Sequence, residues 1–203
     1  MKQCASIALF LALLSGCSKA PEVAKGPPKD EKSPELYRVK FETTKGPVIV
    51  EVHREWAPLG SDRFYTLVKN NYFDGAKFFR VIPDFMAQFG LAADPAVTAR
   101  YEGTELADDP VRQSNTRGMV SFATRGPNSR TTQMFINFGN NARLDQSGFA
   151  PFGQVVSGME AVDGFYNQYG EAPSQGLIKS QGSKYLEASF PLLDSIKTAR
   201  IGD

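Results

Sequence analysis

The stretch FFRVIPDFMAQFG, residues 78–90, decides the fold. Its side chains alternate with a period of two, which predicts two short β-strands. Pro83 fits the first central position of a tight turn, and Asp84 fits the second because aspartate tolerates a positive φ better than most non-glycine residues. The stretch therefore folds back on itself as a hairpin. One face of its first strand then carries Phe78, Arg80 and Ile82.

The turn brings a permanent cation, Arg80, close to an amide, Gln88, beside the apolar side chains of Phe85 and Met86. An apolar floor with a guanidinium and a carboxamide at its rim suits an uncharged amide that carries an apolar ring. The hairpin alone leaves an alternative open, in which it is a core element of a β-domain and Arg80 extends its charged end into water. A second element is needed to choose between them.

That element follows downstream. Residues 120–137, VSFATRGPNSRTTQMFIN, read as a strand, a polar loop and a strand, and Leu144-Asp145 and FGQVVSGM at 152–159 come after them. The order FxRVIPxFMxQ, then SFA…GPNS…QMFI, then LD…FGxVVxGM resembles the cyclophilin family of peptidyl-prolyl cis–trans isomerases. The resemblance covers the chain from about Tyr37 to the C-terminus.

The resemblance implies a mainly β fold, a closed antiparallel eight-stranded β-barrel capped by two α-helices. Residues 37–52 alternate on both sides of a turn, which predicts an antiparallel hairpin, and residues 195–201 are expected to pair with its first strand. Ser61 can cap one helix. Residues 170–193 form a longer connection than the family pattern leads us to expect. A second helix is expected from near Ser157, with helical spacing of Met159, Val162, Phe165 and Tyr166.

The chemistry of the family sets what the site must do. Rotation about a peptide bond has a barrier of about 18–20 kcal/mol because the nitrogen lone pair is delocalised into the carbonyl. A catalyst must bind the twisted amide better than either planar isomer, and it needs no nucleophile, metal or cofactor. Arginine suits this task because it is always charged and its N–H groups can hydrogen-bond the nitrogen lone pair.

The resemblance assigns the roles. It implies that Arg80, Phe85 and Gln88 are catalytic, with Gln88 near the substrate carbonyl. Phe85, Met86, Phe135 and Leu144 match positions that enclose the proline ring. The backbone of Thr124 matches one that grips the residue before proline. The full set implied to bind substrate is Met86, Ala123, Thr124, Gln133, Phe135, Leu144 and Phe149.

The sequence departs from the family at several positions. Asp84 stands where a glycine is usual, and Arg143 stands where cyclosporin-binding members have tryptophan, which puts sensitivity to that drug in doubt. Arg125 and Arg130 lie in the polar loop. They are interpreted either as solvated surface charges or as side chains that favour acidic or extended substrates. The pair Asp108-Asp109 precedes a proline and is interpreted as a turn.

The N-terminus reads as a targeting segment. Residues 1–16 are interpreted as a lipoprotein signal peptide, with a positive Lys2 and an apolar core too short for a bilayer-spanning helix of about 20 residues. Leu14-Ser15-Gly16-Cys17 resembles the bacterial lipobox, in which the cysteine is lipidated and becomes the new N-terminus.

The remaining chain divides in two. Residues 17–34 are interpreted as the lipidated Cys17 and a disordered tether, because prolines and mixed charge occur there without an apolar period. Residues 35–203 are expected, from the resemblance, to form the cyclophilin-like isomerase domain. The expected location is the bacterial cell envelope, facing the periplasm, and the serine after Cys17 indicates the outer membrane.

Composition narrows the partners. Lys+Arg number 23 against 22 Asp+Glu, and removal of Lys2 leaves 22 of each, so nothing favours a nucleic-acid partner. The single histidine, His53, has no ligands at suitable spacing, so we expect no metal and no cofactor. Proline-containing polypeptides are the expected substrates of a monomer anchored to the membrane by its lipid. A non-catalytic proline-peptide binding module or a chaperone on the same scaffold stays open.

Overall fold

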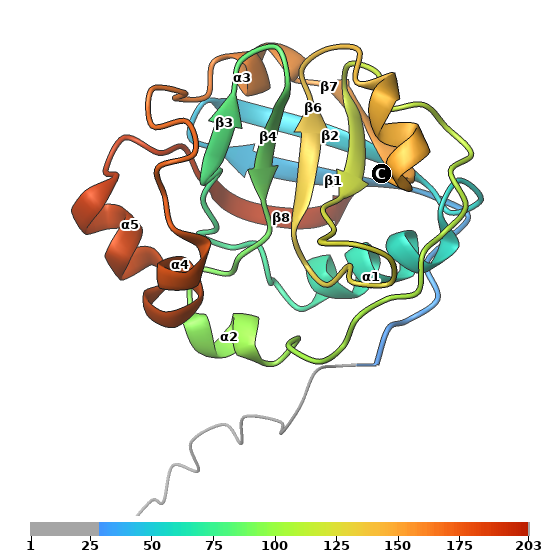
Figure 1. Ribbon diagram of the computed structural model, residues 1–203, viewed down its shortest axis with the longest axis horizontal. Helices are drawn as coiled ribbons and strands as arrows, with labels where there is room; N and C mark the ends of the chain where they lie inside the picture. Colours follow the sequence, from blue (N-terminus) through green and yellow to red (C-terminus); the bar gives the residue numbers. More distant parts are fainter. Residues whose placement is uncertain (1–28, 203) are drawn as a thin grey trace, which may run out of the picture.

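The computed structural model describes residues 29–202. Its strands form one antiparallel sheet of eight strands in the order β3-β4-β6-β5-β7-β2-β1-β8. Figure 1 shows the sheet curled on itself, so that β3, β4 and β6 cross over β2, β1 and β8. The strands are β1 (Leu36–Thr43), β2 (Gly46–His53), β3 (Arg80–Ile82), β4 (Met86–Phe89), β5 (Met119–Phe122), β6 (Met134–Asn137), β7 (Pro151–Ser157) and β8 (Ile196–Gly202).

The predicted architecture of eight antiparallel strands with helices is confirmed, whereas the closure is less complete than a full barrel. The edge strands β3 and β8 do not form a ladder with each other. They are linked through the bridge of Lys77 with Ser195 and a hydrogen bond from Phe78 N to Asp194 O of 3.0 Å. The antiparallel register at this bridge sets the start of β8 opposite the residues before Lys77, with Gly75 N donating to Ile196 O at 2.8 Å, so β8 meets the segment before β3 and not β3 itself.

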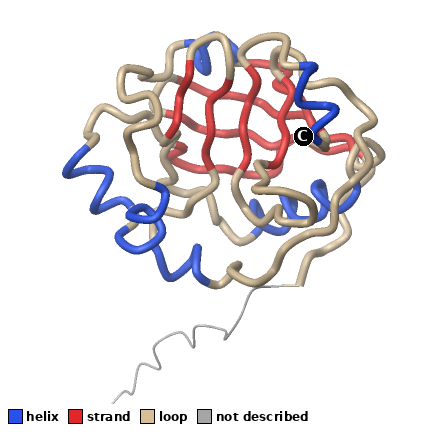
Figure 2. The backbone as a smooth tube through the Cα atoms, in the orientation of Figure 1, coloured by secondary structure: helices blue, strands red, loops and turns tan. Residues whose placement is uncertain are grey.

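Helices surround the sheet at its ends and side, as Figure 2 shows. Those described are α1 (Pro58–Lys69), α2 (Pro95–Ala99), the 3-10 helix η1 (Ala142–Ser147), α3 (Met159–Asp163), α4 (Gln175–Gln181) and α5 (Ser183–Ser189). The core between the two halves of the sheet is strongly aromatic. Phe64 of α1 packs on Phe41 of β1 and Phe152 of β7, at ring centroid distances of 6.2 and 5.0 Å.

Helix α1 begins before the expected cap. Ser61 lies inside the helix, and its hydroxyl is hydrogen-bonded to Ser33 at 2.9 Å. The free N–H groups of Leu59 and Gly60 instead donate to the carboxylate of Asp109, at 3.1 and 2.9 Å. A side chain from a distant loop therefore caps the helix, and the interpretation of Asp109 as a simple turn residue was incomplete.

The segment between α3 and β8 contains structure that the sequence did not reveal. α3 ends at Asp163, so the expected positions Phe165 and Tyr166 lie beyond it. Helices α4 and α5 follow and lie beside the β3 edge of the sheet, with α4 next to α2 (Figure 1). A second buried cluster forms there, separate from the main core, and consists of Phe79, Leu91, Ile178, Leu186 and Leu193.

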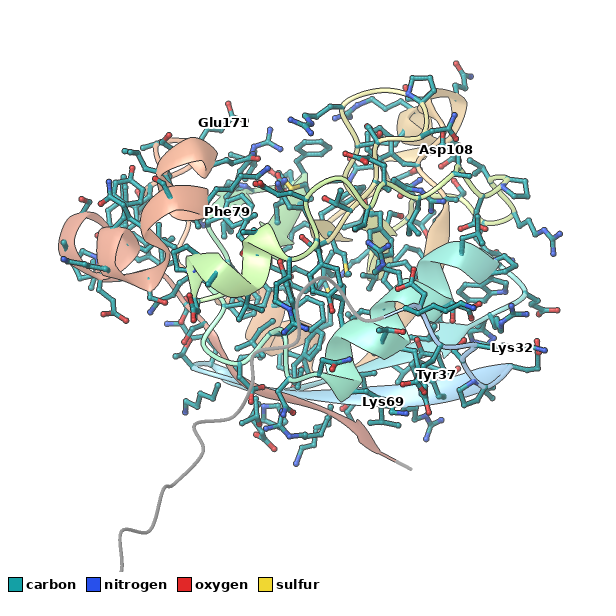
Figure 3. All side chains as sticks on the ribbon, turned by 90° about the horizontal axis from the view of Figure 1, so that it is seen from below. Lys32, Tyr37, Lys69, Phe79, Asp108 and Glu171 are labelled. Atoms are coloured by element: carbon teal, nitrogen blue, oxygen red, sulfur yellow. The ribbon has the colours of Figure 1, made fainter. Side chains whose placement is uncertain are left out.

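This cluster explains why the expected alternation before β3 fails. Phe78 lies in the main core together with Val81, whereas Phe79 turns outward into the second cluster. Figure 3 shows Phe79 beside the segment that carries α4. The regular alternation therefore starts at Arg80, and Phe78 does not share a face with it.

The packed part of the chain begins earlier than the expected boundary at residue 35. Asp30 Oδ1 accepts a 2.7 Å hydrogen bond from Arg63 Nε, and Lys69 Nζ lies 2.6 Å from Glu31 Oε2, so this end of the predicted tether lies against α1. Cys17 and residues 1–16 lie outside the described part. Within residues 29–202, no helix combines the length and apolarity needed to cross a membrane.

Candidate active site

The hairpin β3–β4 forms as the sequence predicts. Phe85 N donates to Ile82 O at 3.1 Å, which closes the turn, and Asp84 adopts a φ of 61° at its second central position. The resulting register places Arg80 directly opposite Gln88. Arg80 Nη1 donates to Gln88 Oε1 at 3.2 Å, so the cation and the amide meet at the end of the ladder.

A cavity of about 420 Å³ opens beside this pair. All ten residues that the sequence assigned to catalysis or substrate binding line it, although they come from four separate parts of the chain. They are Arg80, Phe85, Met86, Gln88, Ala123, Thr124, Gln133, Phe135, Leu144 and Phe149. Because Arg80 borders a cavity, the alternative of a simple core hairpin is disfavoured.

One side of the cavity is apolar. Phe135 of β6 pairs with Gln88 in the sheet register, and its ring meets that of Phe149 edge to face at a centroid distance of 5.7 Å. Two guanidiniums lie over the Phe85 ring, that of Arg80 at 5.8 Å and that of Arg143 at 4.9 Å from its centroid. The rings of Phe85, Phe135 and Phe149 together give the cavity an apolar slot.

The polar groups of the site are oriented by one another. Gln88 accepts from Arg80 through its carbonyl oxygen and donates through Nε2 to Gln133 Oε1 at 2.9 Å. These two bonds fix which way the Gln88 amide faces. Ala123 N donates to Gln133 O at 2.9 Å, which ties the start of the polar loop to β6.

The 3-10 helix that presents Leu144 is anchored by partly buried contacts on both sides of that residue. Asn141 Nδ2 donates to Phe85 O at 2.8 Å and so joins this helix to the hairpin turn. Burial raises the pKa of Asp145, but hydrogen bonds from the Ser114 hydroxyl and from Asn115 outweigh it, so that the pKa lies below its ordinary value. The carboxylate therefore stays charged and holds the helix in place.

The two arginines of the polar loop have different positions. Arg125 is exposed and borders the cavity. The side chain of Arg130 is only 2% exposed and pairs with Asp109 at 3.1 Å, so neither interpretation of Arg130, as a solvated charge or as a substrate contact, was correct. It fastens the loop to the cap of α1 instead.

Sequence reasoning missed the contribution of the segment after α3. Gln175, Gly176 and Lys179 of α4 line the same cavity, and Glu171 pairs with Arg80. The length of residues 170–193 was the available signal, but it did not indicate where the segment packs. Among residues 29–202 there is no group of three or more His, Cys, Asp or Glu that could hold a metal ion.

Comparison with known proteins identifies the family of this chain. The family described as "Cyclophilin type peptidyl-prolyl cis-trans isomerase/CLD" matches residues 38–179. A peptidyl-prolyl cis-trans isomerase of Acinetobacter baylyi is 35% identical over 135 residues, which is 64% of this chain and 71% of that protein. The isomerase ppi1 of Schizosaccharomyces pombe is 38% identical over 131 residues, 61% of this chain and 81% of that protein.

Solved structures show the same fold. A cyclophilin-type isomerase of Cryptosporidium parvum superposes with a TM-score of 0.62 at 23% identity and covers 83% of this chain and 98% of its own. The cyclophilin AquaCyp293 of Hirschia baltica gives a TM-score of 0.62 at 20% identity, and the match covers 83% of this chain and 75% of that chain. The family match over most of the folded region, together with these likenesses, shows that the chain belongs to the cyclophilin-type peptidyl-prolyl cis–trans isomerases.

Proposed function

We propose that this isomerase accelerates X-Pro bond rotation in exported or envelope proteins and so assists their folding at the bacterial cell envelope. X-Pro bonds interconvert over tens to hundreds of seconds without a catalyst, slowly enough to limit folding. The support for the location is the lipobox-like sequence that ends at Cys17, which would anchor the domain by lipid facing the periplasm, in the outer membrane.

The observation that carries the proposed mechanism is the register of Arg80 with Gln88 beside an apolar slot. The proline ring enters the slot formed by Phe85, Met86 and Phe135, and its burial contributes about 1.5–3 kcal/mol. The ring stays fixed while the carbonyl on the other side of the bond turns. Gln88 approaches that carbonyl.

Arg80 supplies the interaction that favours the twisted state. As the amide leaves planarity, its nitrogen regains a lone pair, and an arginine N–H can donate to it. Planar isomers offer no such acceptor, so this hydrogen bond stabilises the transition state more than either ground state. The remaining cavity residues, Ala123, Thr124 and Gln133, hold the chain before the proline.

Exchange NMR on an Ala-Pro peptide tests the mechanism. Wild type should accelerate exchange, and Arg80→Ala should lower the rate about 100-fold, as expected for loss of one transition-state donor. Arg112→Ala is a matched control, because Arg112 is exposed and donates to Glu55 O away from the cavity. Equal rates for wild type and Arg80→Ala would remove Arg80 from the mechanism. Peptide binding without catalysis by wild type would favour a binding module instead.

Cell fractionation tests the location separately. The wild-type protein should incorporate labelled palmitate and sediment with the outer membrane on a density gradient, whereas Cys17→Ser should do neither. Wild type in the soluble fraction without label would contradict the anchor and leave the isomerase activity unaffected.

A further inference from the structure

The guanidinium of Arg80 is held from two sides. On one side, Nη1 donates to Gln88 Oε1 at 3.2 Å and lies 4.0 Å from Met86 Sδ, so it faces the cavity. On the other side, Nε donates to Glu171 Oε1 at 2.6 Å, and Nη2 donates to the same oxygen. These contacts engage four of the five N–H bonds of arginine, so one remains for a further acceptor.

Glu171 comes from the segment that the family pattern did not lead us to expect. Its neighbours are anchored: Ala172 N donates to Tyr169 O at 2.9 Å, and the Tyr169 ring packs edge to face on Phe190 at 5.1 Å. Tyr169 also packs against the second buried cluster, to which Phe79 contributes. Figure 3 shows Glu171 at the outer edge of this segment. The carboxylate is thus placed by a packed support.

The ion pair between Arg80 and Glu171 is exposed to solvent, so its contribution to stability is small. The Glu171 side chain is 64% exposed and that of Arg80 29%. Pairs this open to water contribute little to stability. Arginine has many rotamers, however, and a carboxylate bonded to its Nε edge removes most of them before the substrate arrives. The pair is therefore suited to orienting Arg80 and contributes little to holding the fold together.

We propose that Glu171 is a positioning residue for the isomerase reaction, acting through Arg80. It fixes the Nε edge of the guanidinium and leaves the Nη1 side directed at the cavity. This inference rests on the role proposed for Arg80. The competing possibility is that the carboxylate occupies donors that the substrate needs, in which case it would slow the reaction.

Four variants of the full chain separate these possibilities by exchange NMR with an Ala-Pro peptide. Glu171→Ala should lower kcat/KM about tenfold, mainly through kcat, because a misplaced catalytic group costs rate more than binding. Glu171→Gln keeps a hydrogen-bond acceptor without the charge, so its kcat/KM should lie between those of wild type and Glu171→Ala. Glu187→Ala removes an exposed carboxylate from α5 of the same segment and should match wild type. Glu171→Ala added to Arg80→Ala should cause no further loss, because the effect passes through Arg80.

A spectroscopic readout distinguishes positioning from a general structural effect. The ¹Hε–¹⁵Nε signal of Arg80 should be sharp and slow to exchange in wild type and in Glu187→Ala, and should broaden in Glu171→Ala while the backbone amide spectrum of the sheet stays unchanged. Unchanged or increased kcat/KM in Glu171→Ala would overturn the inference, even if Arg80→Ala is inactive. If wild type itself fails to catalyse, the proposed function fails first.

Discussion

Asp109 and Arg130 form a buried ion pair that joins the cap of α1 to the loop bordering the cavity. Arg130 Nη1 lies 3.1 Å from Asp109 Oδ2, and the two side chains are 2% and 3% exposed. Arg130 Nε lies 3.5 Å from Asp108 Oδ1 and makes no hydrogen bond within residues 29–202. Asp109 therefore serves two partners at once, a helix terminus and a buried cation.

Substitution of Asp109 should be costly. Asp109→Ala should lower the free energy of unfolding by about 3–5 kcal/mol, because it leaves Arg130 buried without its partner and removes the cap of α1. Asp108→Ala is the matched control. The Asp108 side chain is 34% exposed, so we expect a loss below about 1 kcal/mol. Urea unfolding of both variants measures the difference, and equal losses would contradict the role of Asp109.

Substitution of two glycines with positive φ can distinguish the cost of steric overlap from the cost of an unfavourable backbone conformation. Gly90 has a φ of 101°, and an added Cβ would lie 2.2 Å from Thr132 O, whereas Gly103 has a φ of 74° and open space around it. Gly90→Ala should therefore cost more than about 3 kcal/mol and displace Gln133 from the cavity, while Gly103→Ala costs about 1 kcal/mol. Thermal unfolding gives the comparison, and similar melting temperatures would argue against the close approach.

The carboxylate of Asp145 should make the free energy of unfolding fall at low pH. Its pKa is lower in the folded state than in the unfolded chain, so its contribution is complete above about pH 4 and is lost as the pH falls through the folded-state value. Asp145→Asn should lower the free energy of unfolding by about 1–3 kcal/mol at pH 7. The difference in free energy of unfolding between Asp145→Asn and wild type should become smaller below about pH 4. Denaturant unfolding across this range tests it, with Glu187→Gln as the control, and a gap independent of pH would contradict the assignment.

Arg143 should weaken binding of cyclosporin. Its guanidinium lies 4.9 Å from the centre of the Phe85 ring and the residue is exposed, so it keeps a solvated charge at the position where the family resemblance leads us to expect the tryptophan of cyclosporin-binding members. Arg143→Trp should strengthen binding about tenfold or more through added apolar contact. Calorimetric titration of both proteins measures this, with Arg112→Ala as the control. Tight binding by wild type would show that the indole is dispensable.

The local parts of the site could be predicted from sequence because their determinants are adjacent in the chain. The turn at Pro83 and Asp84 follows from backbone preferences and brings Arg80 near Gln88, while the exact register, which leaves Phe85 as an unpaired loop residue, comes from the structure. The positions around the cavity came from the family resemblance, and the structure brings all ten together.

The contacts that were missed depend on residues far apart in sequence. Ser61 is a good capping residue, yet α1 is capped by Asp109, which is 49 residues beyond Gly60. Glu171 is 91 residues from Arg80 and gives no periodic signal. Phe79 appeared to belong to an ordinary alternating strand because its partners, Ile178 and Leu186, lie in a later segment. Tertiary packing decided each of these cases.

The outward turn of Phe79 has a consequence for any attempt to shorten the protein. Phe79 is 1% exposed and Leu91 3%, and both owe this to the side chains of α4, α5 and the approach to β8. A deletion variant that joined α3 directly to β8 would expose an apolar surface patch to water and would tend to self-associate. Such a minimal isomerase would need polar replacements at positions 79 and 91, and it would also lose the carboxylate that meets Arg80.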